Sequence, residues 1–209
     1  MSKYDLVVFD WNGTLLNDLP LVYASVQKIF GVYKLTPPTL EQYRSEITSD
    51  FMKFYWSHGM PDYVTKEDLN KIRSHFFTLH WNDVLLHNNA ALILEYISNL
   101  GLRLSIVSSE ISSVLENRLE QFSLRKFFDL VHGSSWDKEV VLKETLNHFK
   151  IPPEQSVYID DTFDGITAAK NVGMKTIAFT GGYNSRERIL AAKPDFIIDS
   201  LDQLISYIN

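Results

Sequence analysis

Short apolar runs recur along most of the chain, and stretches with helical spacing separate them. Six of the runs are rich in β-branched or aromatic residues and have the length of strands, at residues 6–9, 102–107, 128–131, 157–159, 176–179 and 196–198. Strands that are apolar along their whole length are typical of a parallel sheet with helices on both faces. The alternation therefore predicts an α/β fold built on a doubly wound parallel sheet.

Signals at the helix ends support this interpretation. Gly101 and Gly173 follow helical patterns where a C-terminal glycine is expected. Ser200 and Gln203 have the spacing of a capping box for a last helix over residues 201–208.

Residues 16–86 break the alternation, because they have helical spacing and no convincing strand. One helical face gathers apolar side chains at Val22, Val26, Ile29 and Phe30. Candidate N-caps of further helices are Thr39, Ser49 and Thr65. We therefore expect a smaller all-helical domain at residues 16–86, inserted after the first strand of an α/β core domain at residues 1–15 and 87–209.

Composition and charge narrow the class of protein. The net charge of -6 argues against sequence-independent binding of nucleic acid, which needs clustered lysine and arginine. The chain has no cysteine, so disulfides and thiolate metal sites are excluded. No apolar run reaches about 18 residues, and acidic residues interrupt the N-terminal stretch where a signal peptide would be apolar. We expect a cytoplasmic monomer or homodimer with no nucleic-acid or membrane partner.

Residues able to do chemistry follow several of the predicted strands. Asp10 ends the first strand, Ser108 and Ser109 follow the second, Asp160 and Asp161 follow the fourth, and Lys138 begins the helix before that fourth strand. Each has an ordinary structural explanation, since serine and aspartate often cap helices and a lone lysine is usually solvated. The carboxyl ends of parallel strands, however, lie side by side at one edge of the sheet. This convergence favours a shared site.

The residue types indicate which chemistry the site supports. Asp10, Asp160 and Asp161 form a cluster of hard oxygen ligands, which favours Mg²⁺ over zinc. A serine hydroxyl, backbone N–H groups and a lysine suit a phosphate. A carboxylate, Mg²⁺ and phosphate together suggest nucleophilic catalysis through an aspartyl-phosphate.

These motifs resemble those of a known family. "FDWNGT", "IVSS", Lys138 and "IDDTFDGITAAKNVGM" are similar to the four motifs of the haloacid dehalogenase superfamily, whose members are mostly phosphatases. The helical insert lies where that family carries its C1-type cap, and the layout resembles phosphoglycolate phosphatases and β-phosphoglucomutases. The resemblance implies a Rossmann-like core and a small phosphorylated metabolite as substrate.

The resemblance also implies roles for individual residues. Asp10 is expected to be the nucleophile and a Mg²⁺ ligand, with the backbone carbonyl of Asn12 and the carboxylate of Asp161 as further ligands. Contacts to the substrate phosphate are expected from Thr14, Ser108, Ser109 and Lys138. Asn12, Ser108 and Lys138 thus complete the expected catalytic set around Asp10.

Two of these expected roles have an alternative candidate residue. Asp160 is similar to the acid that assists the metal in β-phosphoglucomutases, which favours a water-mediated metal contact, and Asp164 is the alternative. Lys143 could replace Lys138, but at about 1.5 Å per residue it lies roughly 7 Å further along the helix. We prefer Lys138.

The sequence departs from the family at position 12. In the phosphatases this residue is an Asp that protonates the leaving alcohol and then activates water. Asn12 cannot transfer a proton, and the loss of general acid–base catalysis is expected to slow turnover roughly 10²–10⁴-fold. The sequence alone therefore predicts that Asn12→Asp raises turnover on an alkyl phosphate at least roughly tenfold.

Three interpretations of Asn12 follow. The first, which we prefer, is a slow or specialised Mg²⁺-dependent phosphatase whose acid comes from elsewhere, for example His58. The second is P–C bond cleavage, because "DWNGT" resembles the "DWAGT" of phosphonoacetaldehyde hydrolases; Lys53 would then form the Schiff base, although an exposed helix lysine is its simpler explanation. The third is a phosphate-binding or regulatory protein with little turnover. Phosphoglycolate is suggested as the substrate only by analogy.

Overall fold

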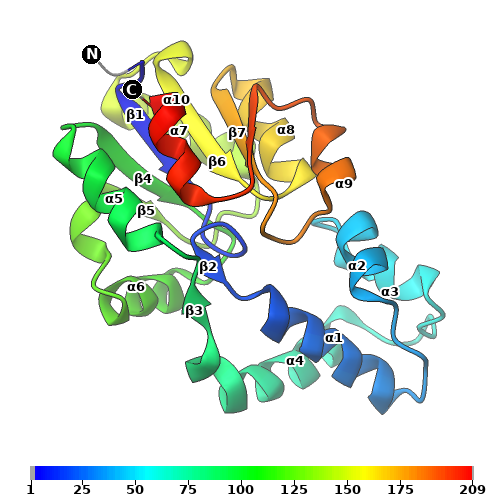
Figure 1. The fold of residues 1–209 in the computed structure, drawn as a ribbon. Coiled ribbons are helices and arrows are strands. Elements are labelled where there is room, and N and C mark those ends of the chain that lie inside the picture. Colours follow the sequence, from blue (N-terminus) through cyan, green and yellow to red (C-terminus); the bar gives the residue numbers. More distant parts are fainter. Residues whose placement is uncertain (1–2, 209) are drawn as a thin grey trace.

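The computed structural model describes residues 3–208, which form a six-stranded parallel sheet with helices on both faces (Figure 1). Its strands are β1 (Leu6–Phe9), β4 (Arg103–Val107), β5 (Leu130–His132), β6 (Ser156–Asp160), β7 (Lys175–Phe179) and β8 (Phe196–Ile198). They lie in the order β5-β4-β1-β6-β7-β8, and each neighbouring pair is parallel. The predicted doubly wound α/β fold is confirmed. The order reverses between β1 and β6, which is where such sheets bind ligands.

The two faces of the sheet have separate helical layers, because side chains alternate along each strand. Val7 and Phe9 of β1 pack with α5 (Ala90–Asn99), α6 (Ser112–Gln121) and α10 (Ile205–Ile208). Leu6 and Val8 pack on the opposite face with α7 (Lys138–Phe149) and α8 (Phe163–Val172). A short helix, α9 (Arg186–Leu190), packs beside α8. All four residues of β1 are buried, as expected for a central parallel strand.

The segment of residues 19–80, which lies between β1 and β4, is helical. Its helices are α1 (Leu19–Val32), α2 (Leu40–Glu46), α3 (Phe51–Ser57) and α4 (Lys66–His80). They form the helical insert, residues 19–80, which projects from one end of the sheet in Figure 1. Its own core includes Val26, Ile29 and Phe30 of α1, the side chains whose shared face the sequence predicts.

Two very short strands join the insert to the sheet. β2 (Leu16–Asn17) and β3 (Leu85–Leu86) pair antiparallel, so the entering and leaving segments are hydrogen-bonded to each other. Both fall in the stretch where the sequence indicates only helices. That expectation was wrong here, because a two-residue strand is too short to show an alternating pattern.

Two of the predicted helix caps are confirmed. Thr39 and Gln42 form a capping box at α2, and Thr65 and Asp68 form one at α4. In each, the hydroxyl accepts a backbone N–H and the longer side chain accepts the N–H of the cap residue.

Two other predicted caps were wrong. The residue before α3 is Asp50, and Ser49 does not cap that helix. The last helical segment is a 3-10 turn (Leu201–Leu204) followed by α10, and Ser200 makes no capping bond to its backbone. Gln203 accepts instead from the N–H of Asp199 at 2.8 Å, one residue earlier than predicted.

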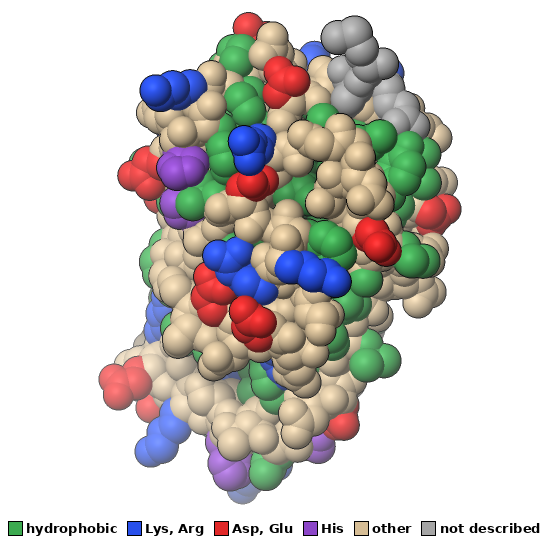
Figure 2. All heavy atoms as spheres, turned by 90° about the vertical axis from the view of Figure 1, so that its left-hand side faces the viewer, with side chains coloured by type: hydrophobic (Ala, Val, Ile, Leu, Met, Phe, Trp, Pro, Cys, Tyr) green, Lys and Arg blue, Asp and Glu red, His purple; other side chains and the backbone are tan. Residues whose placement is uncertain are grey.

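The surface agrees with the charge pattern of the sequence. On the face seen in Figure 2, lysine and arginine side chains lie beside aspartate and glutamate side chains and form no continuous basic surface. Among the helices of residues 3–208, none has the length and apolar character needed to cross a membrane.

Candidate active site

Three buried carboxylates meet at the switch point of the sheet. Asp10 directly follows β1, Asp160 is the last residue of β6, and Asp161 follows it. Phe9 and Ile159 are paired in the parallel register, so Asp10 and Asp160 lie side by side. One oxygen from each of the three carboxylates lies within 4.8 Å of the others. The folding of two adjacent strands thus creates an acidic cluster that the local sequence does not contain.

Lys138 provides the positive charge next to this cluster. It is the first residue of α7, and its Nζ lies 2.7 Å from Oδ1 of Asp10 and 2.6 Å from Oδ2 of Asp160. Lys138 therefore bridges the two strand ends.

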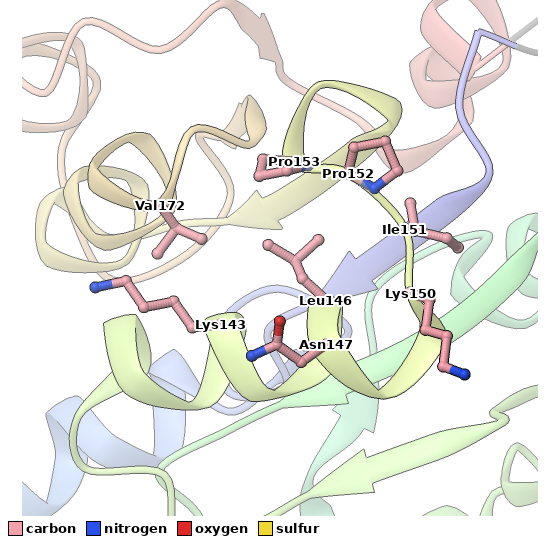
Figure 3. Close-up of a pocket in the computed structure, with 8 residues that line it drawn as sticks. All are labelled: Lys143, Leu146, Asn147, Lys150, Ile151, Pro152, Pro153 and Val172. Atoms are coloured by element: carbon pink, nitrogen blue, oxygen red, sulfur yellow. The ribbon is translucent and has the colours of Figure 1, made fainter.

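Lys143, the rival lysine, lies elsewhere. Its Nζ pairs with Glu139 at 2.8 Å, and the pair is exposed. Figure 3 shows Lys143 on α7 among residues that line a surface pocket of about 650 Å³. Pro152 and Pro153 line the same pocket and precede β6, so the pocket lies toward the amino edge of the sheet, away from Asp10.

Burial makes the cluster electrostatically costly. Desolvation raises the pKa of Asp10 to about 7; the charge of Asp160 adds to this effect, and Lys138 opposes it. Desolvation, together with Asp160 and Asp10, also raises the pKa of Asp161 well above its usual range. Burial acts against the charge of Lys138, but Asp10 and Asp160 outweigh it and raise the lysine pKa. One lysine is too little positive charge for three buried carboxylates.

Backbone and hydroxyl donors fix the orientation of Asp161. Thr14 Oγ1 donates to Oδ1 at 2.7 Å, and the N–H of Tyr183 donates to Oδ2 at 2.6 Å. Gly13 has a left-handed backbone, with φ at 80°, and a Cβ there or at Gly182 would collide with the same carboxylate. The chain is thus tightly packed around this acid, and Thr14 lies among the acids.

The donor set fits a divalent cation. Carboxylates alone make up the cluster, and hard oxygen ligands of this kind suit Mg²⁺ better than zinc or copper. Desolvation is the main cause of both raised pKa values, and a cation between Asp10 and Asp161 would favour their charged forms.

The Asn12 side chain has a different set of hydrogen-bond partners from the acidic cluster. Its Nδ2 donates to Oδ2 of Asp18 at 2.8 Å and lies 3.5 Å from Oε2 of Glu110. Its Oδ1 accepts from the Ser108 hydroxyl at 3.3 Å. The side chain at position 12 is therefore held between two carboxylates and a serine.

Asp18 is a buried acid that the sequence analysis missed. It is 2% exposed, and it accepts the N–H of Gly13 at 2.9 Å and the hydroxyl of Tyr183 at 2.8 Å. Desolvation raises its pKa to about 6, against the hydrogen bonds from Asn12, Tyr183 and Gly13. Asp18 directly precedes α1, and Pro20 marks the start of that helix, so the sequence suggests an N-cap. Its backbone is helical, however, and its side chain makes no capping bond.

Other candidates from the sequence lie apart from these contacts. Ser109 is exposed, whereas Ser108 is buried. Asp164 accepts the backbone N–H of Ser49 at 2.8 Å and so ties α8 to the helical insert. Of the two rivals for assisting Asp161, Asp160 is the one in the cluster.

The two insert residues with suggested catalytic roles have other partners. His58 Nδ1 lies 2.9 Å from the carbonyl oxygen of Phe54, and its Nε2 lies 3.5 Å from Glu46. The Lys53 side chain is 76% exposed and pairs with Asp50 at 3.1 Å. A Schiff-base lysine is normally desolvated or placed beside another cation, and Lys53 has neither environment.

Known proteins with similar sequences cover the whole chain. A family model described as haloacid dehalogenase-like hydrolase matches residues 7–179. A phosphoglycolate phosphatase of Vibrio parahaemolyticus is 23% identical over 100% of this chain and 98% of its own length. The pyrophosphatase PpaX of Bacillus mycoides is 24% identical over 99% of this chain and 98% of its own length.

Solved structures agree on the fold. A predicted phosphoglycolate phosphatase from Haemophilus somnus superposes with a TM-score of 0.79 at 20% identity, over 99% of this chain and 98% of the other. CbbY from Rhodobacter sphaeroides, solved in complex with phosphate, gives a TM-score of 0.74 at 19% identity over 96% of each chain. With the family model covering most of its length, this chain belongs to the haloacid dehalogenase-like hydrolases.

Proposed function

We propose that this hydrolase is a Mg²⁺-dependent phosphatase of a small phosphorylated metabolite and that it acts through an aspartyl-phosphate on Asp10. The observation that carries the proposal is the position of Asp10. It is a buried carboxylate at the switch point, 2.7 Å from Lys138 and clustered with Asp160 and Asp161. Phosphoglycolate phosphatases and pyrophosphatases among the relatives support a phosphorylated substrate.

The chain's own residues supply most of the chemistry. An oxygen of Asp10 attacks phosphorus, the O–P bond forms, and the bond from phosphorus to the leaving oxygen breaks. Ser108 and Lys138 hold the phosphoryl oxygens. Water then attacks the same phosphorus and gives up a proton to solvent, the bond between Asp10 and phosphorus breaks, and inorganic phosphate leaves. With Asn12 in place of an acid, the leaving alkoxide takes its proton from water.

The acidic cluster would hold the metal. Asp10 and Asp161 would bind it with the backbone carbonyl of Asn12, and Asp160 would assist through water. A bound Mg²⁺ neutralises the charge of the phosphoryl group and orients it toward the nucleophile.

The helical insert is proposed to act as the cap, with residues 16–86 as the cap domain and residues 1–15 and 87–209 as the core. It contacts the core beside the site. The Arg44 guanidinium donates to the carbonyl oxygens of Thr180 at 2.7 Å and Asn184 at 3.1 Å. These contacts join the insert to the loop after β7, and the Tyr183 N–H of the same loop donates to Asp161, so the insert lies where it can select the substrate.

A screen of phosphorylated metabolites with Mg²⁺ tests the proposal, with phosphoglycolate and inorganic pyrophosphate included. Turnover that depends on Mg²⁺ and on Asp10 is expected. Asp10→Asn removes the nucleophile but keeps the shape of the side chain, so turnover should fall at least roughly 10³-fold. Phosphate release measures this effect, and circular dichroism checks the fold. Phosphate release that is unchanged in Asp10→Asn, or absent from wild-type protein on every ester, would reject the proposed reaction.

A further inference from the structure

The surroundings of Asn12 explain more than its inability to transfer a proton. We propose that Asp18 is a positioning residue of this active site, which holds the Asn12 carboxamide with its nitrogen turned away from Ser108 and its oxygen turned toward it. Asn12 and Asp18 then form one unit, in which the carboxyl group stands at position 18 and the amide at position 12. The catalytic meaning of this unit rests on the proposed phosphatase function.

The first support is the orientation of the amide. Nδ2 of Asn12 lies 2.8 Å from a carboxylate oxygen of Asp18 and 3.5 Å from one of Glu110. An ionised carboxylate only accepts hydrogen bonds, so the NH₂ group must face these acids. The amide oxygen then faces the other way, where Ser108 donates to it at 3.3 Å. Position 12 therefore presents an acceptor to the phosphate-binding serine.

The second support is the use of both oxygens of the Asp18 carboxylate. Its Oδ1 accepts from Gly13, and its Oδ2 accepts from both Asn12 and Tyr183. The donors come from the turn after β1 and from the loop after β7, so Asp18 links both to the start of α1. Asp18 makes these bonds instead of capping α1, although it lies at the N-cap position. A buried carboxylate with three donors is a stable anchor.

This arrangement changes what Asn12→Asp is expected to do. The new carboxyl would lie 2.8 Å from Asp18 and 3.5 Å from Glu110, in place of a donor. The new side chain has no N–H to donate, so it loses the hydrogen bond that holds position 12 to Asp18. Without that anchor, the new carboxyl is not held in place to serve the leaving group. The single substitution Asn12→Asp is therefore not expected to give the tenfold gain that the sequence alone predicts.

Exchanging both residues tests the unit. In the double variant N12D/D18N, the amide at position 18 donates to the carboxylate at position 12, so the hydrogen bond is kept with its direction reversed. We expect N12D alone to change kcat on an alkyl phosphate by less than about threefold. The exchange variant should exceed N12D by at least roughly tenfold, within the range of general acid–base catalysis. D18N alone should lower kcat several-fold with little change in KM, because the amide at position 12 loses its anchor.

The neighbouring residue offers a matched control. N17D adds the same negative charge one residue before Asp18, but Asn17 is exposed and belongs to β2. Its kcat should equal that of the wild type. Intact-mass measurement checks that the Asn12 side chain has not deamidated to a carboxylate.

Urea unfolding gives a readout that does not need turnover. N12D should lower the unfolding midpoint relative to the wild type, and adding D18N should restore it. Restored stability without turnover on any ester would keep the Asn12–Asp18 unit and reject the phosphatase. A tenfold or larger gain from N12D alone, or additive effects of the two substitutions on the unfolding midpoint, would overturn the proposal.

Discussion

Two parts of the site, the acidic cluster (the acidic flank) and the contacts of Asp18 with Asn12 (the hydrogen-bonded flank), are held by different forces. On one flank, Lys138 bridges Asp10 and Asp160 by ion pairs, and Asp161 adds a third buried acid. On the other flank, Asn12 and Tyr183 hold Asp18 by hydrogen bonds, and the N–H of Gly13 engages its second oxygen. The first flank accumulates charge that a cation would relieve, whereas the second is satisfied by the protein alone. One side is thus built to take up a ligand and the other to fix a geometry.

The largest expected effect is on the Mg²⁺ affinity of the acidic flank. Asp161→Asn removes a charge without changing shape, and loss of a direct ligand should weaken Mg²⁺ binding at least roughly tenfold, the lower end of what loss of an outer-shell partner costs. Asp164→Asn is the matched control, because Asp164 lies three residues on but faces Ser49 of the insert. Isothermal titration calorimetry measures both. Equal Mg²⁺ affinity in the two variants would remove Asp161 from the metal site.

The pH dependence of stability sharpens the same comparison. Without metal, the pKa of Asp10 is raised to about 7 from 3.8, so between about pH 4 and pH 7 the folded chain holds a proton that the unfolded chain has released. Stability should therefore fall as the pH rises through this window. Urea unfolding in EDTA at pH 5 and pH 7.5 measures the fall, and saturating Mg²⁺ should reduce it.

Other acids with shifted pKa values and a variant of Asp10 serve as controls for this pH dependence. Asp195 and Asp199 have lowered pKa values, so their contributions change at more acidic pH, outside the window. Asp10→Asn should reduce the fall without abolishing it, because burial also raises the pKa values of Asp18 and Asp161. A profile that is already flat in the metal-free wild type would mean that a proton is not bound to the cluster.

The smallest expected effect concerns the hydrogen-bonded flank. Tyr183→Phe removes the hydroxyl that donates to Asp18, which should lower turnover two- to fivefold and cost about 0.5–1.5 kcal/mol of stability. Tyr23→Phe is the control, since its hydroxyl donates to the carbonyl oxygen of Pro38 inside the insert. Both should lose similar stability in urea unfolding, but only Tyr183→Phe should lose turnover. Equal turnover in the two variants would contradict the anchoring role of Tyr183.

The sequence predicts the acidic flank far better than the other. The six strands are continuous apolar runs, and in a parallel sheet the residues that follow adjacent strands must meet, so Asp10 and Asp160 could be placed together without coordinates. Lys138 and Lys143 could be ranked by helical rise alone, and the structure brings only Lys138 to the acids.

The hydrogen-bonded flank could not be predicted from the sequence in this way. Asp18 has the sequence context of an N-cap, and only the backbone conformation at that residue turns its side chain back toward Gly13. Tyr183 lies in a loop 165 residues further on, with no periodic pattern to place it. The short β2–β3 pair could not be predicted for the same reason, because tertiary contacts rather than a local sequence pattern determine where such short segments lie.

That β2–β3 pair has a mechanical consequence. Asn12 lies on the core side of β2, and Asp18 lies on the insert side. His87 directly follows β3, and its Nε2 lies 3.0 Å from the carbonyl oxygen of Gly13. The segments that enter and leave the insert therefore both contact the turn after β1. Because Asp18 is the first residue on the insert side of β2, any change in the position of the insert would act directly on its hydrogen bond to Asn12. The orientation of residue 12 is thus coupled to the position of the helical insert through the residues of a single turn.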